Sequence, residues 1–174
     1  IELSQQYDIV RATVGIHPCE AQDISVEEIP VQMATLEKMI LENPTVVGLG
    51  EIGFDYYHLS RDDDEAARQK TRQVAWFHAQ AQLAIKYQLP VVIHTRNCPL
   101  LTLDELNKSG LSKFVVHCFS ENMDFAEKIF KLSPETKISF TGILTYPKSI
   151  SIHEVAINAP LNRIMIETDA PYLI

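Results

Sequence analysis

Short runs of β-branched and apolar residues alternate with helical patterns along this chain, and that alternation limits its fold more than any other feature. The runs cover residues 9–16, 45–49, 90–93, 113–116, 137–141 and 163–168. Several are apolar almost throughout, which is typical of strands whose two faces are both covered by helices. The pattern therefore predicts right-handed βαβ units and a parallel sheet, that is, an α/β fold.

Helical signals fill the segments between these runs. Two long helices are predicted over 25–42 and 61–88, and Pro30 indicates that the first begins close to it. Thr102 and Glu105 have the spacing of a capping box. Shorter helices are predicted around 125–130 and 152–157 from apolar spacing.

Two architectures fit this order, an open doubly wound sheet and a (β/α) barrel. The open sheet usually carries a glycine-rich phosphate loop after a strand, but Gly48-Leu49-Gly50 continues with Glu51 rather than with that fingerprint. A TIM barrel places its chemistry at the C-terminal ends of several strands. The 174 residues show no linker, so we predict a single domain over 1–174, a TIM barrel of which six βα units are visible.

Charge and cysteine content narrow the class of protein. Fifteen Lys and Arg against 23 Asp and Glu give a net charge of −8, which argues against a basic face that binds nucleic acid by bulk charge. Three cysteines without a Cys-x-x-Cys pair favour thiols in a reducing compartment. No apolar run approaches the roughly 20 residues that span a bilayer. We therefore expect a cytoplasmic protein that does not enter a membrane.

Polar residues follow the apolar runs at the point where each predicted strand ends. Two are carboxylates and three are imidazoles: Glu51, Asp169, His17, His94 and His117. One strand-end histidine is more often a structural residue than a ligand, but Glu51, His94, His117 and Asp169 on one barrel rim form a metal-binding set. Imidazole with carboxylate suits Zn, Mn, Fe or Ni, whereas Mg favours carboxylates and water. One or two such ions would activate a water for hydrolysis.

Other polar residues receive simpler interpretations. Three histidines that follow no apolar run are interpreted as surface or packing residues: His58, His78 and His153. Cys118 is predicted to be a core thiol, because alternation along a strand points it away from His117. Arg96 lies two residues after His94, where it could clamp a phosphate or form a salt bridge with Asp55 or Glu51.

The candidate ligands, together with His17 and Arg96, lie in segments that resemble the TatD family of metal-dependent deoxyribonucleases. The matching segments, in chain order, are Val14-Gly15-Ile16-His17-Pro18, Gly50-Glu51-Ile52-Gly53-Phe54-Asp55-Tyr56, Val92-Ile93-His94-Thr95-Arg96, His117-Cys118-Phe119-Ser120, Ile138-Ser139-Phe140-Thr141-Gly142 and Glu167-Thr168-Asp169-Ala170-Pro171-Tyr172-Leu173. Together they extend over essentially the whole chain.

The resemblance implies a TIM barrel of the amidohydrolase type that hydrolyses phosphodiester bonds at the 3′ ends of DNA, or alternatively of RNA. It implies one or two divalent ions, Mg²⁺ first, with Mn²⁺ or Zn²⁺ as alternatives. Glu51 would bind or bridge metal, and His94 and His117 would be ligands. Asp169 would be a ligand that also orients the attacking water or acts as its base, and His17 would lie on the substrate side. No obligate protein partner is implied.

The sequence also departs from the family pattern. It has no His-x-His pair of the kind that many members carry on their first strand, and its own first strand matches the family's third. A TIM barrel typically needs about 250 residues, so we expect an incomplete barrel without the first two strands and the C-terminal helices. Cys19 stands where His often follows His-Pro, and Asn97 stands where Asp often follows the Arg.

Two alternative functions remain open from the sequence. Ligand sets of this kind also support small-molecule hydrolases of the amidohydrolase type. The missing His-x-His pair leaves room for a catalytically inactive barrel that serves as a binding module.

Overall fold

A computed structural model describes residues 1–172, so Leu173, the last residue of the final matching segment, lies outside the described residues. The chain forms two compact units, Ile1–Cys98 and Pro99–Ile174. Each unit contains three parallel strands, which confirms the predicted α/β class. Whether the whole chain is one domain stays a prediction. Among residues 1–172, no helix combines the length and the apolar character needed to cross a bilayer.

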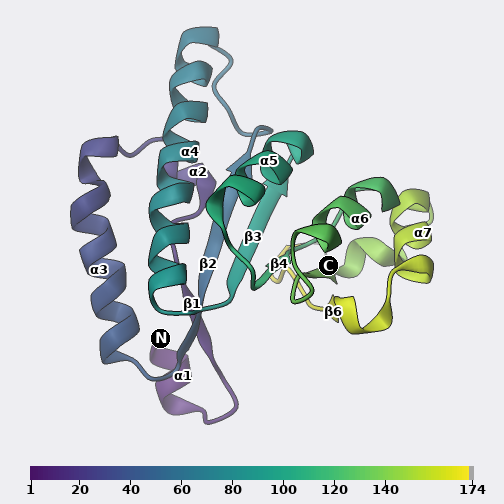
Figure 1. Cartoon of the computed structure of the whole chain (residues 1–174), viewed down its shortest axis with the longest axis horizontal. Coiled ribbons are helices and arrows are strands. Elements are labelled where there is room, and N and C mark those ends of the chain that lie inside the picture. Colours follow the sequence, from purple (N-terminus) through teal and green to yellow (C-terminus); the bar gives the residue numbers. More distant parts are fainter. Residues whose placement is uncertain (173–174) are drawn as a thin grey trace. The chain divides into compact units, whose positions relative to one another are not determined.

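The first unit consists of strands β1 to β3 in that order, with helices between them (Figure 1). Its elements are α1 (Glu2–Gln6), β1 (Ala12–Val14), α2 (Pro18–Ala21), the 3₁₀ helix η1 (Val26–Glu28), α3 (Ile29–Glu42), β2 (Val46–Asp55), α4 (Asp63–Lys86) and β3 (Val91–Arg96). Helix α4 packs against β2, and α3 packs against α4. Pro30 lies in the first turn of α3, which confirms that this helix begins beside it.

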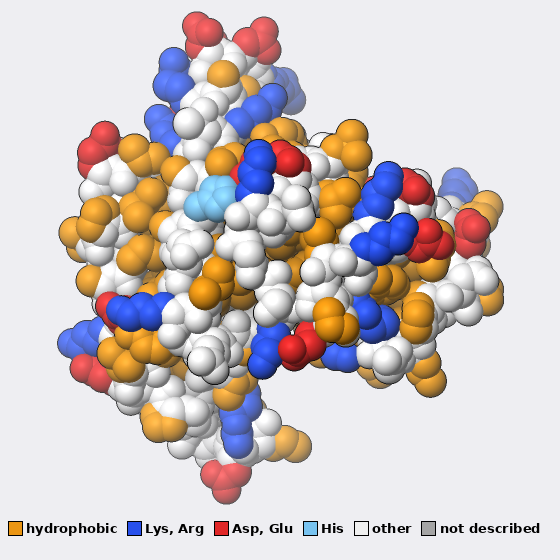
Figure 2. Space-filling view, viewed as in Figure 1, with side chains coloured by type: hydrophobic (Ala, Val, Ile, Leu, Met, Phe, Trp, Pro, Cys, Tyr) orange, Lys and Arg blue, Asp and Glu red, His pale blue; other side chains and the backbone are white. Residues whose placement is uncertain are grey.

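Aromatic side chains form the core between α4 and β2. Phe54, Trp76 and Phe77 are almost completely buried, and the ring centroids of Phe54 and Phe77 are 4.8 Å apart. Burial of each such side chain contributes about 1.5–3 kcal/mol. The opposite face of α3 is exposed, and Figure 2 shows hydrophobic side chains over it; Val31 and Leu41 are among the exposed residues. Trp76 and Phe77 thus pack α4 against β2, the strand that carries Glu51.

The second unit repeats the strand–helix order with β4, β5 and β6 in parallel. Its elements are α5 (Pro99–Ser109), β4 (Phe114–Val116), α6 (Met123–Leu132), β5 (Lys137–Phe140), the 3₁₀ helix η2 (Gly142–Thr145), α7 (Ile150–Asn158), the 3₁₀ helix η3 (Leu161–Arg163) and β6 (Ile164–Ile166). Helix α6 buries Phe125, Ala126 and Ile129 on one face and packs against α5 and α7. The Asn122 side chain caps its N-terminus by accepting a hydrogen bond from the Phe125 N–H.

Three local predictions are wrong. Strands β2 and β3 continue to Asp55 and Arg96, so Glu51 and His94 lie within strands rather than after them. The reason is that a polar residue does not end a strand while the neighbouring strand still satisfies its backbone groups. The capping box at Thr102 is also wrong, because α5 begins at Pro99 and Thr102 lies buried inside the helix.

Two leucines of α5 test how much the buried face of a single helix contributes to stability. Leu106 is 1% exposed and Leu100 is 75% exposed. We expect Leu106→Ala to lower the free energy of unfolding by about 2–5 kcal/mol, because it removes buried methyl groups and leaves a cavity. Leu100→Ala should change it by less than about 0.5 kcal/mol. Urea denaturation of both variants measures this, and equal losses would contradict the burial assigned to α5.

Candidate metal centre

The first unit holds four of the predicted site residues on neighbouring elements. Glu51 lies on β2, His94 and Arg96 lie on β3, and His17 follows β1 as the N-cap of α2. In the pairing of β2 with β3, Gly53 lies opposite His94. The backbone of Gly53 has φ +141°, and a Cβ there would lie 2.0 Å from the His94 carbonyl oxygen. Only glycine therefore fits opposite His94, which explains why residue 53 of the Gly50–Tyr56 segment is a glycine.

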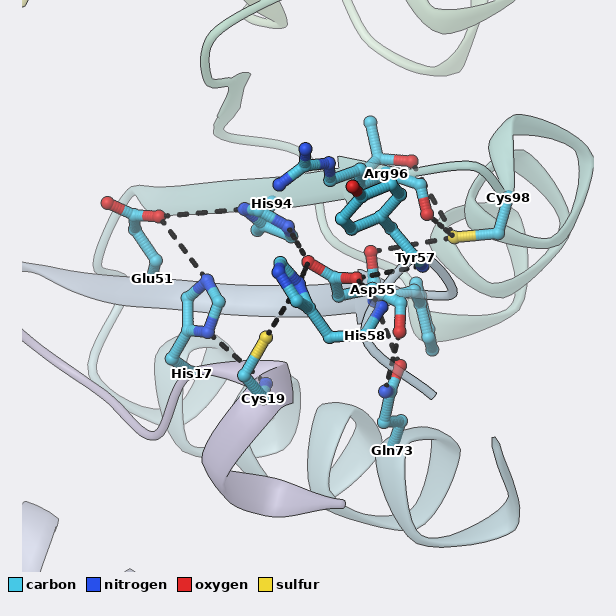
Figure 3. A network of polar contacts seen from close by, with 12 residues as sticks. His17, Cys19, Glu51, Asp55, Tyr57, His58, Gln73, His94, Arg96 and Cys98 are labelled. Atoms are coloured by element: carbon cyan, nitrogen blue, oxygen red, sulfur yellow. Dashed lines mark hydrogen bonds and ion pairs between the residues drawn. The ribbon is translucent and has the colours of Figure 1, made fainter. Parts of the chain in front are cut away.

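His17, Glu51 and His94 form a group in which the candidate ligand atoms lie within 4.8 Å of one another (Figure 3). Glu51 Oε2 is 3.9 Å from His17 Nε2 and 3.8 Å from His94 Nδ1. These separations are too long for hydrogen bonds. Two atoms that each lie about 2.0–2.2 Å from one ion are at most about 4.4 Å apart. The spacing of Glu51 and His94 therefore suits two ligands of a shared ion.

A buried carboxylate decides which nitrogen of His94 carries the lone pair. His94 Nε2 lies 3.1 Å from Asp55 Oδ2, and an ionised carboxylate only accepts, so Nε2 donates. The lone pair is then on Nδ1, the atom that faces Glu51. Carboxylates that orient a metal-binding histidine in this way are a regular part of metal sites. His94 thus presents its unprotonated Nδ1 towards Glu51.

His17 is arranged differently. Its Nδ1 accepts a hydrogen bond from the Cys19 N–H at 3.2 Å, so in the neutral ring the proton is on Nε2. The atom of His17 that faces Glu51 is therefore a donor. A donor suits contact with an anionic substrate better than it suits metal ligation, in keeping with the substrate-side role that the family resemblance implies.

Asp55 is 1% exposed and is surrounded by donors. Its Oδ1 accepts from the Tyr57 and His58 N–H groups, both at 2.9 Å, while Oδ2 lies 2.9 Å from His58 Nδ1 in addition to its contact with His94. Burial by itself raises the pKa of the Asp55 carboxyl, but the hydrogen bonds from His94 and His58 hold it well below its usual range. Asp55 therefore stays ionised and keeps orienting His94.

The second unit contains the same arrangement around His117. His117 Nδ1 lies 3.0 Å from Glu167 Oε2, and the Cys118 N–H donates to Glu167 Oε1 at 2.7 Å. Burial raises the pKa of Glu167, but hydrogen bonds from His117, the Ser139 hydroxyl and the Cys118 N–H lower it to about 2. The lone pair of His117 is then on Nε2, which lies 3.9 Å from Asp169 Oδ1. Each unit thus pairs an oriented histidine with a carboxylate that faces its unprotonated nitrogen.

Arg96 has its guanidinium over the ring of Tyr57, with Cζ 4.0 Å from the ring centroid (Figure 3). Stacking of this kind holds the planar group in one orientation while its N–H donors remain directed outward. Tyr57 is 58% exposed, so the stacked pair lies at the surface of the first unit. Sequence reasoning did not find the role of Tyr57.

One further sequence prediction is wrong. Cys118 lies beyond the end of β4 with φ +45°, so strand alternation does not apply to it, and it is half-buried rather than a core thiol, with its Sγ 3.3 Å from Thr141 Oγ1. His58 lies at the surface, as interpreted, with its side chain 48% exposed, and in addition it contacts Asp55. The orienting roles of Asp55 and Glu167 were missed, although each lies only a few residues from a predicted ligand, Glu51 or Asp169.

The family comparison agrees with these segments. A sequence model of the family described as TatD related DNase matches residues 1–174, and the chain belongs to this family. An uncharacterized metal-dependent hydrolase of Escherichia coli, YcfH, is 32% identical over 99% of this chain and 60% of its own length. The human 3′-5′ RNA nuclease TATDN2 is 30% identical over 96% of this chain and 21% of its own length.

Solved structures agree on the fold. The crystal structure of YJJV, a TatD homologue from Escherichia coli, matches 99% of this chain and 62% of its own chain with a TM-score of 0.84 and 31% identity. A TatD family hydrolase from Entamoeba histolytica matches with a TM-score of 0.77 and 27% identity, over 99% of this chain and 56% of its own. This chain therefore spans about three fifths of YcfH and of these two solved proteins, and its parallel α/β fold is that of the solved structures.

The orienting role of Asp55 gives a test that does not depend on catalysis. Asp55→Asn keeps an oxygen for the two backbone N–H groups but removes the charge that orients His94. We expect the affinity for Mn²⁺, measured by calorimetry, to fall about 10–100-fold. Asp64→Asn, in the exposed first turn of α4, is the matched control and should leave it unchanged. Unchanged affinity in a folded Asp55→Asn variant would contradict the orienting role.

The lowered pKa of Glu167 predicts a pH dependence of stability. Because this pKa is about 2 in the folded chain against an ordinary 4.5, the ionised carboxyl stabilises the fold above about pH 4.5. That contribution should be lost as the pH falls towards 2. We expect the free energy of unfolding to fall less steeply over this range in Glu167→Gln than in the unaltered chain. The exposed Glu127→Gln variant should keep the original slope, and an equally steep slope in Glu167→Gln would contradict the assignment.

Proposed function

We propose that this chain forms part of a TatD-like nuclease, a metal-dependent hydrolase that releases nucleotides from the 3′ ends of DNA, with RNA as the alternative substrate. The observation that supports it most is the repeated pairing of a histidine with an orienting carboxylate, Asp55 for His94 and Glu167 for His117. An arrangement that fixes histidine tautomers is typical of metal sites rather than of binding modules. Membership of the TatD related DNase family supports the substrate class.

Four residues are proposed as the metal ligands: Glu51, His94, His117 and Asp169. They would hold one or two divalent ions, Mg²⁺ first, with Mn²⁺ or Zn²⁺ as alternatives. A bound ion would lower the pKa of a water towards neutrality and polarise the phosphoryl oxygen. The donor chemistry fits, since Glu51 and Asp169 supply carboxylate oxygens and both histidines present an unprotonated nitrogen.

Asp169, in addition to binding metal, and two residues outside the ligand set would act on the substrate and on protons. Asp169 orients the attacking water or accepts its proton. His17 donates from Nε2 to a phosphate oxygen, because its Nδ1 is occupied as an acceptor. Arg96, held on the Tyr57 ring, supplies parallel N–H donors for a phosphate. We further propose a cytoplasmic location, which the presence of Cys19, Cys98 and Cys118 as thiols favours.

Release of nucleotides from 3′-labelled single-stranded DNA and RNA tests this function. We expect release with Mg²⁺ or Mn²⁺ that is abolished by EDTA. It should fall at least about 100-fold in Glu51→Gln, because a direct ligand matters more than the 10–100-fold effect of an orienting residue. Glu42→Gln, at the exposed end of α3, is the matched control and should keep full activity.

The outcomes separate the candidate substrates and the alternative functions. Release from DNA alone or RNA alone would decide between the two nucleic acids. A folded protein that binds metal but cleaves neither would contradict the nuclease and favour a small-molecule hydrolase. A folded protein that binds no divalent ion would contradict every hydrolase function proposed here.

A further inference from the structure

A second group of potential ligands shares Asp55 with His94, since His58 and His94 both contact Asp55 Oδ2. It consists of Cys19 on α2, Asp55 at the end of β2 and His58 in the loop that follows, and their ligand atoms lie within 4.8 Å of one another (Figure 3). We propose that these three residues bind a thiophilic divalent cation, Zn²⁺, at a site separate from the Glu51 and His94 ligands. The proposal does not rest on the nuclease function.

The donor set selects the class of ion. Thiolate, imidazole and carboxylate are the three protein ligands of Zn²⁺, whereas Mg²⁺ and Ca²⁺ bind oxygen ligands. A site that contains Cys19 therefore favours a different ion from the oxygen-rich set proposed for Mg²⁺. Soft thiolate ligands also bind Cu(I), so Zn²⁺ is the choice among divalent ions rather than among all metals.

The distances fit a tetrahedral ion. Zn–S and Zn–N bonds of about 2.3 and 2.0–2.1 Å place sulfur and nitrogen about 3.6 Å apart, and Cys19 Sγ lies 3.6 Å from His58 Nδ1. His58 Nδ1 and Asp55 Oδ2 are 2.9 Å apart because a proton joins them. When an ion replaces that proton, these two atoms need to separate to about 3.4 Å.

Burial and charge are also suitable. Asp55 is buried and ionised, and Cys19 is half-buried beside it. Burial and the Asp55 charge raise the pKa of Cys19 to about 12, so it is a neutral thiol without an ion. A cation would neutralise both the carboxylate and the thiolate that forms when the ion binds. The His58 side chain is 48% exposed, which provides a path for the ion and room for a water as fourth ligand. Asp55 Oδ2 has a second lone pair with which it continues to accept from His94.

The protons balance in the binding step. The Cys19 thiol gives up its proton to solvent as the S–Zn bond forms. The His58 ring remains neutral, because the proton on Nδ1 is replaced by the ion and Nε2 takes up a proton. One proton per ion is therefore released.

Cobalt is the spectroscopic probe of this site, because thiolate bound to Co²⁺ gives a charge-transfer absorption in the near ultraviolet. We expect this band on titration of the whole chain with Co²⁺, at one ion per chain. It should be lost in Cys19→Ser and in His58→Gln. It should persist in Cys98→Ser and Cys118→Ser, which test the other two thiols, and in Glu51→Gln, which removes the proposed nuclease ligand. X-ray absorption of the Zn²⁺ form should show one sulfur at about 2.3 Å.

Three results would overturn the proposal. The first is no thiolate band in the folded chain at saturating Co²⁺. The second is a band that survives Cys19→Ser, which would assign it to another thiol. The third is a band lost in Glu51→Gln, which would make the two sites one. Circular dichroism establishes that each variant is folded, and if Cys19→Ser does not fold, the half-exposed His58→Gln decides the question. Retention of the band in an inactive Glu51→Gln variant keeps this test independent of the nuclease assay.

Discussion

The hydrogen bond between Asp55 and His94 is the interaction on which the arrangement of the first unit depends. It joins two adjacent parallel strands at the side-chain level, and it links a buried charge to an imidazole that faces Glu51. A buried carboxylate is costly unless donors surround it. Asp55 meets this condition with two backbone N–H groups and two histidines. The same contacts that allow the charge to be buried therefore also determine the tautomer of His94.

In the second unit, a different set of donors stabilises the ionised Glu167. It accepts from His117, Ser139 and the backbone of Cys118; Ser139 lies on β5, and the other two lie in the segment after β4. Both units thus use an acidic residue that is not itself a predicted ligand to prepare a histidine that is. The repetition matters, because one carboxylate–histidine contact is common in any protein, whereas two that each leave a lone pair facing a carboxylate indicate metal chemistry.

Much of the fold could be predicted from the sequence, because the residue patterns that indicate strands and helices are local. The six strands and most helices lie where the apolar periodicity predicts them. The errors lie at boundaries, where tertiary contacts decide. Strand β2 continues past Glu51 because β3 pairs with it as far as Arg96, and Cys118 leaves the strand pattern because its backbone turns.

The sequence by itself determined the parallel α/β class, the family, and which residues offer metal-ligand chemistry, because these depend on residue type and on spacing along the chain. Only the tertiary structure decided the roles of Asp55, Glu167, Tyr57 and His58. The contacts that orient His94 and His117 join residues 39 and 50 positions apart in the chain. No local pattern specifies which nitrogen of a histidine meets a carboxylate that far away, because that choice is made by packing between strands.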